Sequence, residues 1–236
     1  MDILHTLQTL NACHGPSGDE REIADAIQKL AAPYVDACST DVMGNLICHK
    51  KGPGSRVLFC AHMDSIGCIV THIEKEGFLR FGKVGGLHPH SILHTPVRFK
   101  SGVQGVISLD EGVEPKDMTL DDLYIDIGAH DADEAKAMVQ IGDTAVYNTP
   151  TFAAGDRLVS PYMDNRISCA VLFQVLEQAG VEPVDVPIRG GTDGARLSFL
   201  GLPCPNLCTG GYNGHGVLEC ITAQALETVS QLLVKI

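Results

Sequence analysis

Residues 57–67 read VLFCAHMDSIG, an apolar run of β-forming residues that ends in His62 and Asp64. This run predicts a strand that ends at His62. Because side chains alternate along a strand, His62 and Asp64 leave the same face of its end. An imidazole in this position can bind a metal ion while the carboxylate accepts its other ring proton and sets its tautomer. The segment therefore predicts half of a hydrolytic metal site.

Helical and strand patterns alternate on both sides of this segment. Apolar spacing predicts helices over 3–10, 19–32, 167–176, 194–200 and 222–235, and strands over 34–42, 45–50, 184–188 and 206–208. Ser17 and Glu20 fit a capping box at the start of the second helix. Helices that alternate with buried strands indicate a protein of the α/β class.

The sequence pattern changes between residues 71 and 151, where it predicts short strands separated by glycine. These strands are predicted around 78–81, 95–99, 105–107 and 123–127, before one helix over 133–138. The change indicates a small β-rich domain inserted into the first. We therefore expect one discontinuous domain over 1–70 and 152–236, and an inserted domain over 71–151.

Composition narrows the class of protein. The chain has 236 residues, which can bury a sizeable core, and a formal net charge of -12. This charge argues against a nucleic-acid partner, because binding phosphates needs clustered Lys and Arg. No apolar run is long enough to span a bilayer, and no basic region precedes one at the start, so we expect neither a membrane partner nor a signal peptide. Nine scattered cysteines predict buried thiols in a reducing cytoplasm.

Three further residues are candidates for chemistry. Asp164 precedes a predicted helix, where backbone amides stabilise a carboxylate, and taken alone it is better explained as a plain helix cap. His215 lies in the glycine-rich loop GGYNGHG, residues 210–216, and its simpler interpretation is a surface histidine. Asp193 also begins a predicted helix, and we assign it a structural role.

Arg189 ends a predicted strand next to this loop region. Its planar guanidinium can grip a substrate carboxylate in two places, whereas the simpler interpretation is an ordinary salt bridge. His88, His90 and His94 lie close together in sequence and suit a zinc or nickel site. Because no cysteine or carboxylate accompanies them, we favour a loop and strand that merely carry histidines.

The chain also resembles a known family. Motifs similar to the glutamyl or deblocking aminopeptidases that assemble into tetrahedral dodecamers are AHMDSIG (61–67), FLRF to VGG (78–86), LYIDIGA (123–129), IGD (141–143) and SPYMDNR (160–166). From residue 187 on, the motifs PIRGGTDGARLS (187–198), GLPCPN (201–206) and TGGYNGHG (209–216) look more like the end of peptidase T, a related tripeptide aminopeptidase.

This resemblance implies a fold, an activity and roles for the candidate residues. The fold is a three-layer α/β/α zinc-peptidase domain, here shortened, interrupted by a small β-barrel-like domain for accessory or oligomerisation roles. The activity is that of a metal-dependent aminopeptidase that acts on short peptides and assembles into a homo-oligomer. The implied metal is zinc or cobalt. The family binds two metal ions per chain, and we expect one or two here. By the resemblance, His62 and His215 each bind a metal, Asp164 bridges two, and Asp64 orients His62 as part of the catalytic machinery. Arg189 and Asn213 are assigned to substrate binding.

One expected feature is missing. Both families place a Glu-Glu pair after the helix that follows the bridging aspartate, and one more ligand aspartate on a later strand. Here residues 178–185 read QAGVEPVD, in which only Glu182 and Asp185 are acidic. A two-metal hydrolase needs a base and several anionic ligands. The alternative function is therefore a catalytically weak or inactive relative that binds metal or peptide as an oligomeric module.

Overall fold

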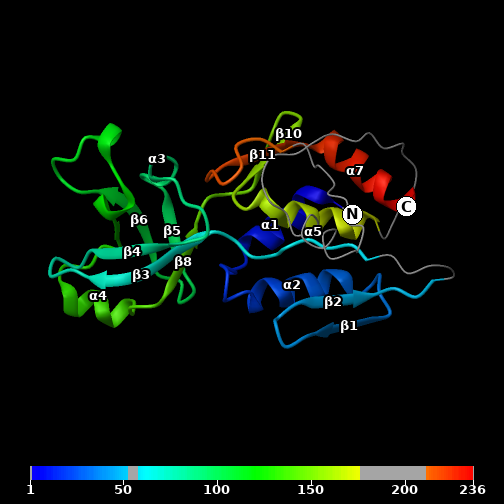
Figure 1. Cartoon of the computed structure of the whole chain (residues 1–236), viewed down its shortest axis with the longest axis horizontal. Helices are drawn as coiled ribbons and strands as arrows, with labels where there is room; N and C mark the ends of the chain where they lie inside the picture. Colours follow the sequence, from blue (N-terminus) through cyan, green and yellow to red (C-terminus); the bar gives the residue numbers. More distant parts are fainter. Residues whose placement is uncertain (1, 53–57, 176–210, 236) are drawn as a thin grey trace, which may run out of the picture.

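The computed structural model describes residues 2–52, 58–175 and 211–235. Figure 1 shows two parts side by side: a β-rich part built from residues 67–147, and a part rich in helices that contains both ends of the described chain. The helices of the described residues are all too short or too polar to cross a membrane. The arrangement matches the prediction of a mixed α/β protein with a small β-rich unit in the middle of the chain.

The β-rich part is a closed barrel. Its strands are β3 (Gly67–Ile73), β4 (Leu79–Val84), β5 (Pro96–Phe99), β6 (Gln104–Leu109), β7 (Leu123–Asp126) and β8 (Thr144–Tyr147). They pair in the order β3-β4-β7-β6-β5-β8, and β8 returns to β3 antiparallel, with Cys68 opposite Ala145. Closure leaves no free sheet edge. At the seam, a Cβ on Gly67 would lie 2.6 Å from the carbonyl oxygen of Ala145, so only glycine fits there.

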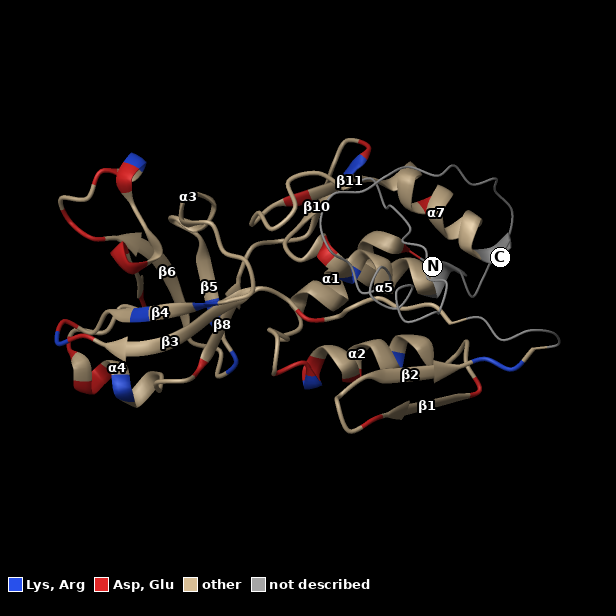
Figure 2. Ribbon diagram, viewed as in Figure 1, with Lys and Arg blue, Asp and Glu red and all other residues tan. Residues whose placement is uncertain are grey.

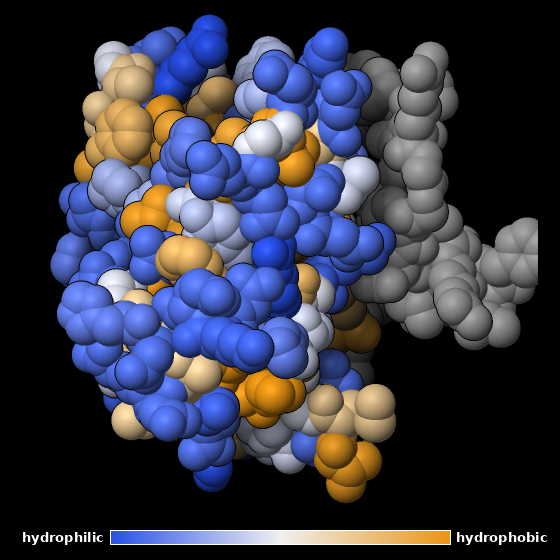
Figure 3. Space-filling model, turned by 90° about the vertical axis from the view of Figure 1, so that its left-hand side faces the viewer, coloured by the Kyte–Doolittle hydropathy of each residue, from blue (hydrophilic) through white to orange (hydrophobic). Residues whose placement is uncertain are grey.

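Alternation of side chains explains the barrel core. On β4, Leu79 and Phe81 are buried while Arg80 is only partly so, and on β6 Ile107 is buried between more exposed neighbours. Two short helices, α3 (Pro89–Ile92) and α4 (Ala132–Met138), and two 3-10 turns, η1 (Pro115–Asp117) and η2 (Leu120–Asp122), complete this part. Seen from the barrel side, the surface is mostly hydrophilic with separate hydrophobic spots (Figure 3).

The other part packs helices around a second hydrophobic core. Its helices are α1 (Ile3–Ala12), α2 (Arg21–Ala31), α5 (Met163–Val175) and α7 (Ala223–Lys235). Helix α5 packs against both α1 and α7, and Leu7, Leu10, Ile167 and Leu226 are among the buried side chains that they share. Acidic and basic residues are spread along the ribbon of both parts (Figure 2).

Two small sheets accompany these helices. Strands β1 (Ala37–Thr40) and β2 (Leu46–His49) form an antiparallel hairpin, as the sequence predicts, and β9 (Phe152–Ala154), β10 (Arg157–Ser160) and β11 (Glu219–Thr222) form a three-stranded sheet. Within 2–52, 58–175 and 211–235, no strand joins these two sheets into one. The predicted strands over 184–188 and 206–208 and the helix over 194–200 lie outside the described residues.

Two local predictions are wrong. Residues 58–64 form no strand, because no described strand pairs with them; only Ser65 makes an isolated bridge, to Pro16. Ser17 does not cap α2 either, since its hydroxyl donates to Asp64, while Glu20 instead accepts the N–H of Gly18. Ser17 thus contacts the segment that carries His62 and Asp64 instead of capping α2.

Candidate active site

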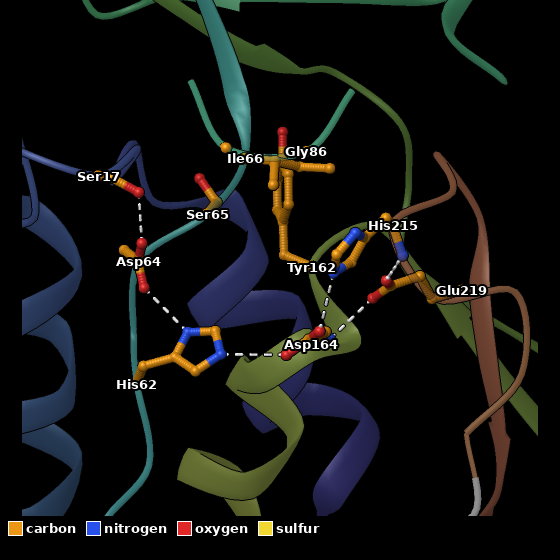
Figure 4. A pocket seen from close by; sticks show the side chains of 11 residues that line it. Ser17, His62, Asp64, Ser65, Ile66, Gly86, Tyr162, Asp164, His215 and Glu219 are labelled. Carbon is orange, nitrogen blue, oxygen red and sulfur yellow. Dashed lines mark hydrogen bonds and ion pairs between the residues drawn. The ribbon is translucent and has the colours of Figure 1, made fainter. Parts of the chain in front are cut away.

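His62 and Asp64 lie on an extended segment that leads into the barrel. His62 Nδ1 is 2.9 Å from Asp64 Oδ1, and the hydroxyl of Ser17 donates to the other oxygen of Asp64 (Figure 4). The hydrogen bond from His62 lowers the pKa of Asp64 to about 2. Asp64 therefore stays ionised and fixes the orientation of the imidazole, the arrangement predicted from their spacing.

Asp164 lies between two imidazoles. It stands at the start of α5 with non-helical backbone angles, φ -84° and ψ 101°. Its Oδ1 is 3.0 Å from Nε2 of His62, and its Oδ2 is 3.3 Å from Nε2 of His215. The hydrogen bond with His62 is the main cause that lowers the pKa of Asp164. In turn, the bonds to Asp164 and then to Asp64 raise the pKa of His62 to about 10.

His215 reaches this carboxylate from a tight turn. Its backbone has a left-handed φ of 63°, a conformation that costs a non-glycine residue energy unless its surroundings hold it. The ring also packs against the barrel, because a Cβ on Gly86 would lie only 3.2 Å from His215 Nδ1. Gly86 leaves the space into which the imidazole fits.

Glu219 completes the arrangement, and sequence reasoning missed it. Its side chain is only 3% exposed at the start of β11, where burial raises its pKa. One carboxylate oxygen accepts the backbone N–H of Asp164 at 2.8 Å, and the other accepts the backbone N–H of His215. Glu219 thus holds the backbones of both residues in place (Figure 4). The available signal was a lone acidic residue in the apolar run VLECI, residues 217–221.

Arg166 in α5 is a second buried residue that holds the backbone around the site. Its side chain is 0% exposed, and its guanidinium donates to the backbone carbonyl of Met63, which lies between His62 and Asp64. It also donates to the carbonyl of Leu10 in the last turn of α1, and to those of Cys13 and Gly15 in the segment that follows this helix. These bonds tie the start of α5 to the His62 segment and to the N-terminal helices.

Tyr162 links the site to the barrel. Its hydroxyl accepts the backbone N–H of Tyr147 on β8, and the two rings stack with centroids 5.6 Å apart. The two parts enclose a hollow of about 220 Å³. Its lining comes from both parts, namely Ser17, His62, Asp64, Ser65, Ile66, Gly85, Gly86, Tyr162, Asp164, His215 and Glu219.

The structure brings together His62, Asp64, Asp164 and His215, four of the six residues assigned from the sequence. Asn213 does not line the hollow; its side-chain amide donates to the carbonyl of Leu218 and so closes the His215 turn. Its role toward substrate stays a prediction. Arg189, Asp193, Glu182 and Asp185 lie outside the described residues.

The histidine-rich segment 88–94 forms α3 and the turn after it instead of a loop and a strand. His88 precedes the helix, His90 lies within it, and all three histidines, His94 included, are exposed. No group of three potential ligands able to hold a metal ion occurs there or elsewhere in the described part of the chain.

The donor types in the hollow nevertheless suit a divalent metal. Two imidazoles and one carboxylate are ligands that zinc and cobalt accept. At present Asp164 pairs directly with His62 and His215, so a metal would have to replace these contacts. Three such donors can hold one zinc ion with an open position, whereas two ions would need further anionic ligands.

Comparisons with known proteins point to one group of enzymes. A family profile described as M42 glutamyl aminopeptidase matches residues 44–193. A relative from Acetivibrio thermocellus is 40% identical over 178 residues, which are 75% of this chain and 54% of the relative. Peptidase T of Vibrio cholerae is 59% identical over 63 residues, which are 27% of this chain and 15% of that protein. The chain spans about half the length of the first relative.

Solved structures with a similar fold were also found. An aminopeptidase from the archaeon Desulfurococcus kamchatkensis has a TM-score of 0.69 at 32% identity, and the match covers 74% of this chain and 51% of that chain. PhTET1-12s, solved as a dodecamer, has a TM-score of 0.76 over 99% of this chain and 98% of its own. At 22% identity, the second match shows the fold alone.

Proposed function

The chain belongs to the M42 glutamyl aminopeptidase family, and on this premise we propose that it is a metal-dependent aminopeptidase that removes N-terminal residues from short peptides. The observation that carries the proposal is the position of Asp164, whose two oxygens face His62 and His215 inside one hollow. Two imidazoles and one carboxylate form one of the ligand sets that catalytic zinc sites use.

In this proposal His62, Asp164 and His215 hold zinc or cobalt, one or two ions per chain. The bound metal supplies Lewis acidity, which lowers the pKa of water and provides a nucleophile near neutral pH. Asp64 accepts the Nδ1 proton of His62, which would leave Nε2 of His62 available as the metal ligand. Glu219 fixes the backbones of Asp164 and His215 through two N–H bonds, and so acts as a positioning residue.

The dimensions of the hollow support a small substrate group. About 220 Å³ is less than the roughly 300–1,000 Å³ of pockets that take drug-sized ligands. Ile66 and Tyr162 give it apolar surface beside the ionised side chains. This size suits the first residue of a peptide, while Arg189 and Asn213 are kept as proposed contacts to the rest of the substrate.

We also propose the division of the chain into a catalytic part, 1–70 and 152–236, and an accessory part, 71–151. The two hydrophobic cores support it, because the side chains of the barrel pack mostly among themselves. A homo-oligomer built through the accessory part is proposed on the motifs that resemble aminopeptidases which assemble into dodecamers. A cytoplasmic location rests on the scattered cysteines of the sequence.

A second candidate function has an observation of its own. The chain spans about half the length of its first relative, and its sequence has no Glu-Glu pair. Each oxygen of Glu219 accepts one backbone N–H, so the role that these contacts support is to position Asp164 and His215 rather than to take the place of the missing pair. The alternative is a catalytically weak or inactive relative that binds metal or peptide as an oligomeric module.

The two functions differ in turnover. The full chain, loaded with zinc or cobalt, is incubated with a panel of short peptides, and released amino acids are quantified together with bound metal. We expect release that is lost in His62→Ala and kept in His72→Ala, an exposed histidine on β3. Bound metal without release from any peptide would support the module instead. Equal release by His62→Ala and wild type would refute the proposed site.

A further inference from the structure

The β1–β2 hairpin carries two cysteines that face each other. Cys38 and Cys48 are directly opposite in the antiparallel pairing, and their sulfur atoms are 3.2 Å apart. Cys48 is exposed and Cys38 is partly exposed, whereas Cys13, Cys68 and Cys169 are buried. The expectation of buried thiols is therefore wrong for this pair, as it is for the exposed Cys60. Solvent and small reagents can reach Cys38 and Cys48.

The register of the hairpin places the pair where a bridge can form. The backbone N–H of Asp41 donates to the carbonyl of Asn45 at 3.1 Å, which makes these two a hydrogen-bonded pair. Because bonded and non-bonded pairs alternate in an antiparallel ladder, Cys38 and Cys48 occupy a non-bonded position. Cα atoms there are about 4.5 Å apart, within the range of about 4.4–6.8 Å that a disulfide allows.

The turn keeps this register without help from the thiols. The side chain of Asp41 accepts the N–H groups of Met43 and Asn45, each at 2.9 Å, and the side-chain amide of Asn45 at 2.8 Å. Gly44 supplies the positive φ, 88°, that the turn requires. At the other end, Asp36 accepts the N–H of Lys51 at 2.6 Å. The reduced hairpin thus already holds the two sulfur atoms together, so closing the bond orders little additional chain.

We propose that Cys38 and Cys48 form a redox-active dithiol that a small-molecule disulfide, such as oxidised glutathione, converts to an intramolecular disulfide. The thiolate of one cysteine attacks a sulfur of the small disulfide, which forms a mixed disulfide and releases one small thiol. The second cysteine, deprotonated, attacks the mixed disulfide and releases the other small thiol. The pair loses two protons and two electrons, and the small disulfide gains both. This inference rests on the hairpin alone and is independent of the proposed peptidase function.

The test uses the full chain, oxidised glutathione and mass spectrometry of the digested protein. In the wild type we expect the peptides that contain Cys38 and Cys48 to become linked, with the loss of two hydrogen atoms and no glutathione retained on either. Cys38→Ser should keep glutathione on Cys48, because no second thiol is there to displace it. Cys220→Ser, which alters a partly exposed cysteine on β11, should behave as the wild type.

A rate measurement separates a pre-formed pair from two thiols that meet by chance. Asp41→Ala removes the side-chain bonds of the turn and should slow ring closure about threefold to tenfold, with no change in the final product. The proposal is overturned if both thiols stay reduced, if the wild type retains glutathione on Cys38 or Cys48, or if Asp41→Ala closes the ring at the wild-type rate.

Discussion

Replacing Glu219 by glutamine examines how the site is held together. The carboxylate uses one oxygen for the N–H of Asp164 and the other for the N–H of His215. A glutamine amide can accept only one of these bonds and turns its NH2 group toward the other donor. A buried donor left unpaired costs about 1–3 kcal/mol, partly offset because a buried charge is removed.

We therefore expect Glu219→Gln to lower the free energy of unfolding by about 1–3 kcal/mol. For a chain of this length, that loss lowers Tm by roughly 2–10 °C. The larger effect falls on metal binding, because residues that orient ligands typically contribute about 10- to 100-fold in affinity. Zinc titration by calorimetry and thermal unfolding in a chelator measure the two effects separately.

The matched control is Glu227→Gln on α7, an exposed carboxylate that accepts a hydrogen bond from the side-chain amide of Gln231. It should leave both zinc affinity and Tm close to those of the wild type. If Glu219→Gln binds zinc as tightly as Glu227→Gln, Glu219 does not position the site, and the reasoning from its two N–H bonds is refuted.

Three further predictions follow from the supports of the site. Arg166→Met leaves buried carbonyls without donors and should lower the free energy of unfolding in urea titrations by about 1–3 kcal/mol for each carbonyl left unpaired. An unchanged midpoint would contradict these hydrogen bonds. Gly86→Ala pushes on the ring of His215 and should weaken zinc binding about tenfold with little change in stability, so equal affinity would place the imidazole elsewhere in the loaded protein. In the metal-free folded protein, the pKa of His62 is raised from its ordinary 6.5 to about 10. The ion pairs of protonated His62 therefore stabilise the fold fully below pH 6.5, and this stabilisation is lost as the pH rises through about 10. Thermal unfolding in a chelator should therefore show a fall in Tm over that range, and His62→Gln should flatten it; parallel curves would refute the His62 ion pairs.

Local sequence patterns were sufficient to predict the helices and strands whose packing partners lie close along the chain. The glycine-separated apolar runs of 78–127 predict strands of the barrel, and the hairpin of β1 and β2 follows from its turn at Met43 and Gly44. Residues 58–64 have the same apolar pattern but form no strand, because a pattern cannot supply a partner strand. Whether such a segment becomes a strand depends on its pairing with a segment that is distant in the sequence.

The same distinction applies to the site. His62 and Asp64 are two residues apart, so their spacing predicts the contact that the structure contains. Glu219 acts on the backbone of Asp164, 55 positions away, and Arg166 on carbonyls more than 100 positions away. Nothing in the spacing of either residue identifies these backbone partners, which only the folded chain brings near.

The most direct test of the metal site is anomalous diffraction from a crystal of the full chain loaded with zinc. We expect a zinc peak within bonding distance, about 2.0–2.2 Å, of Nε2 of His62 or His215 and of a carboxylate oxygen of Asp164. A zinc peak at the exposed histidines of α3, or a hollow that holds no zinc while Asp164 keeps its contacts to both imidazoles, would contradict it.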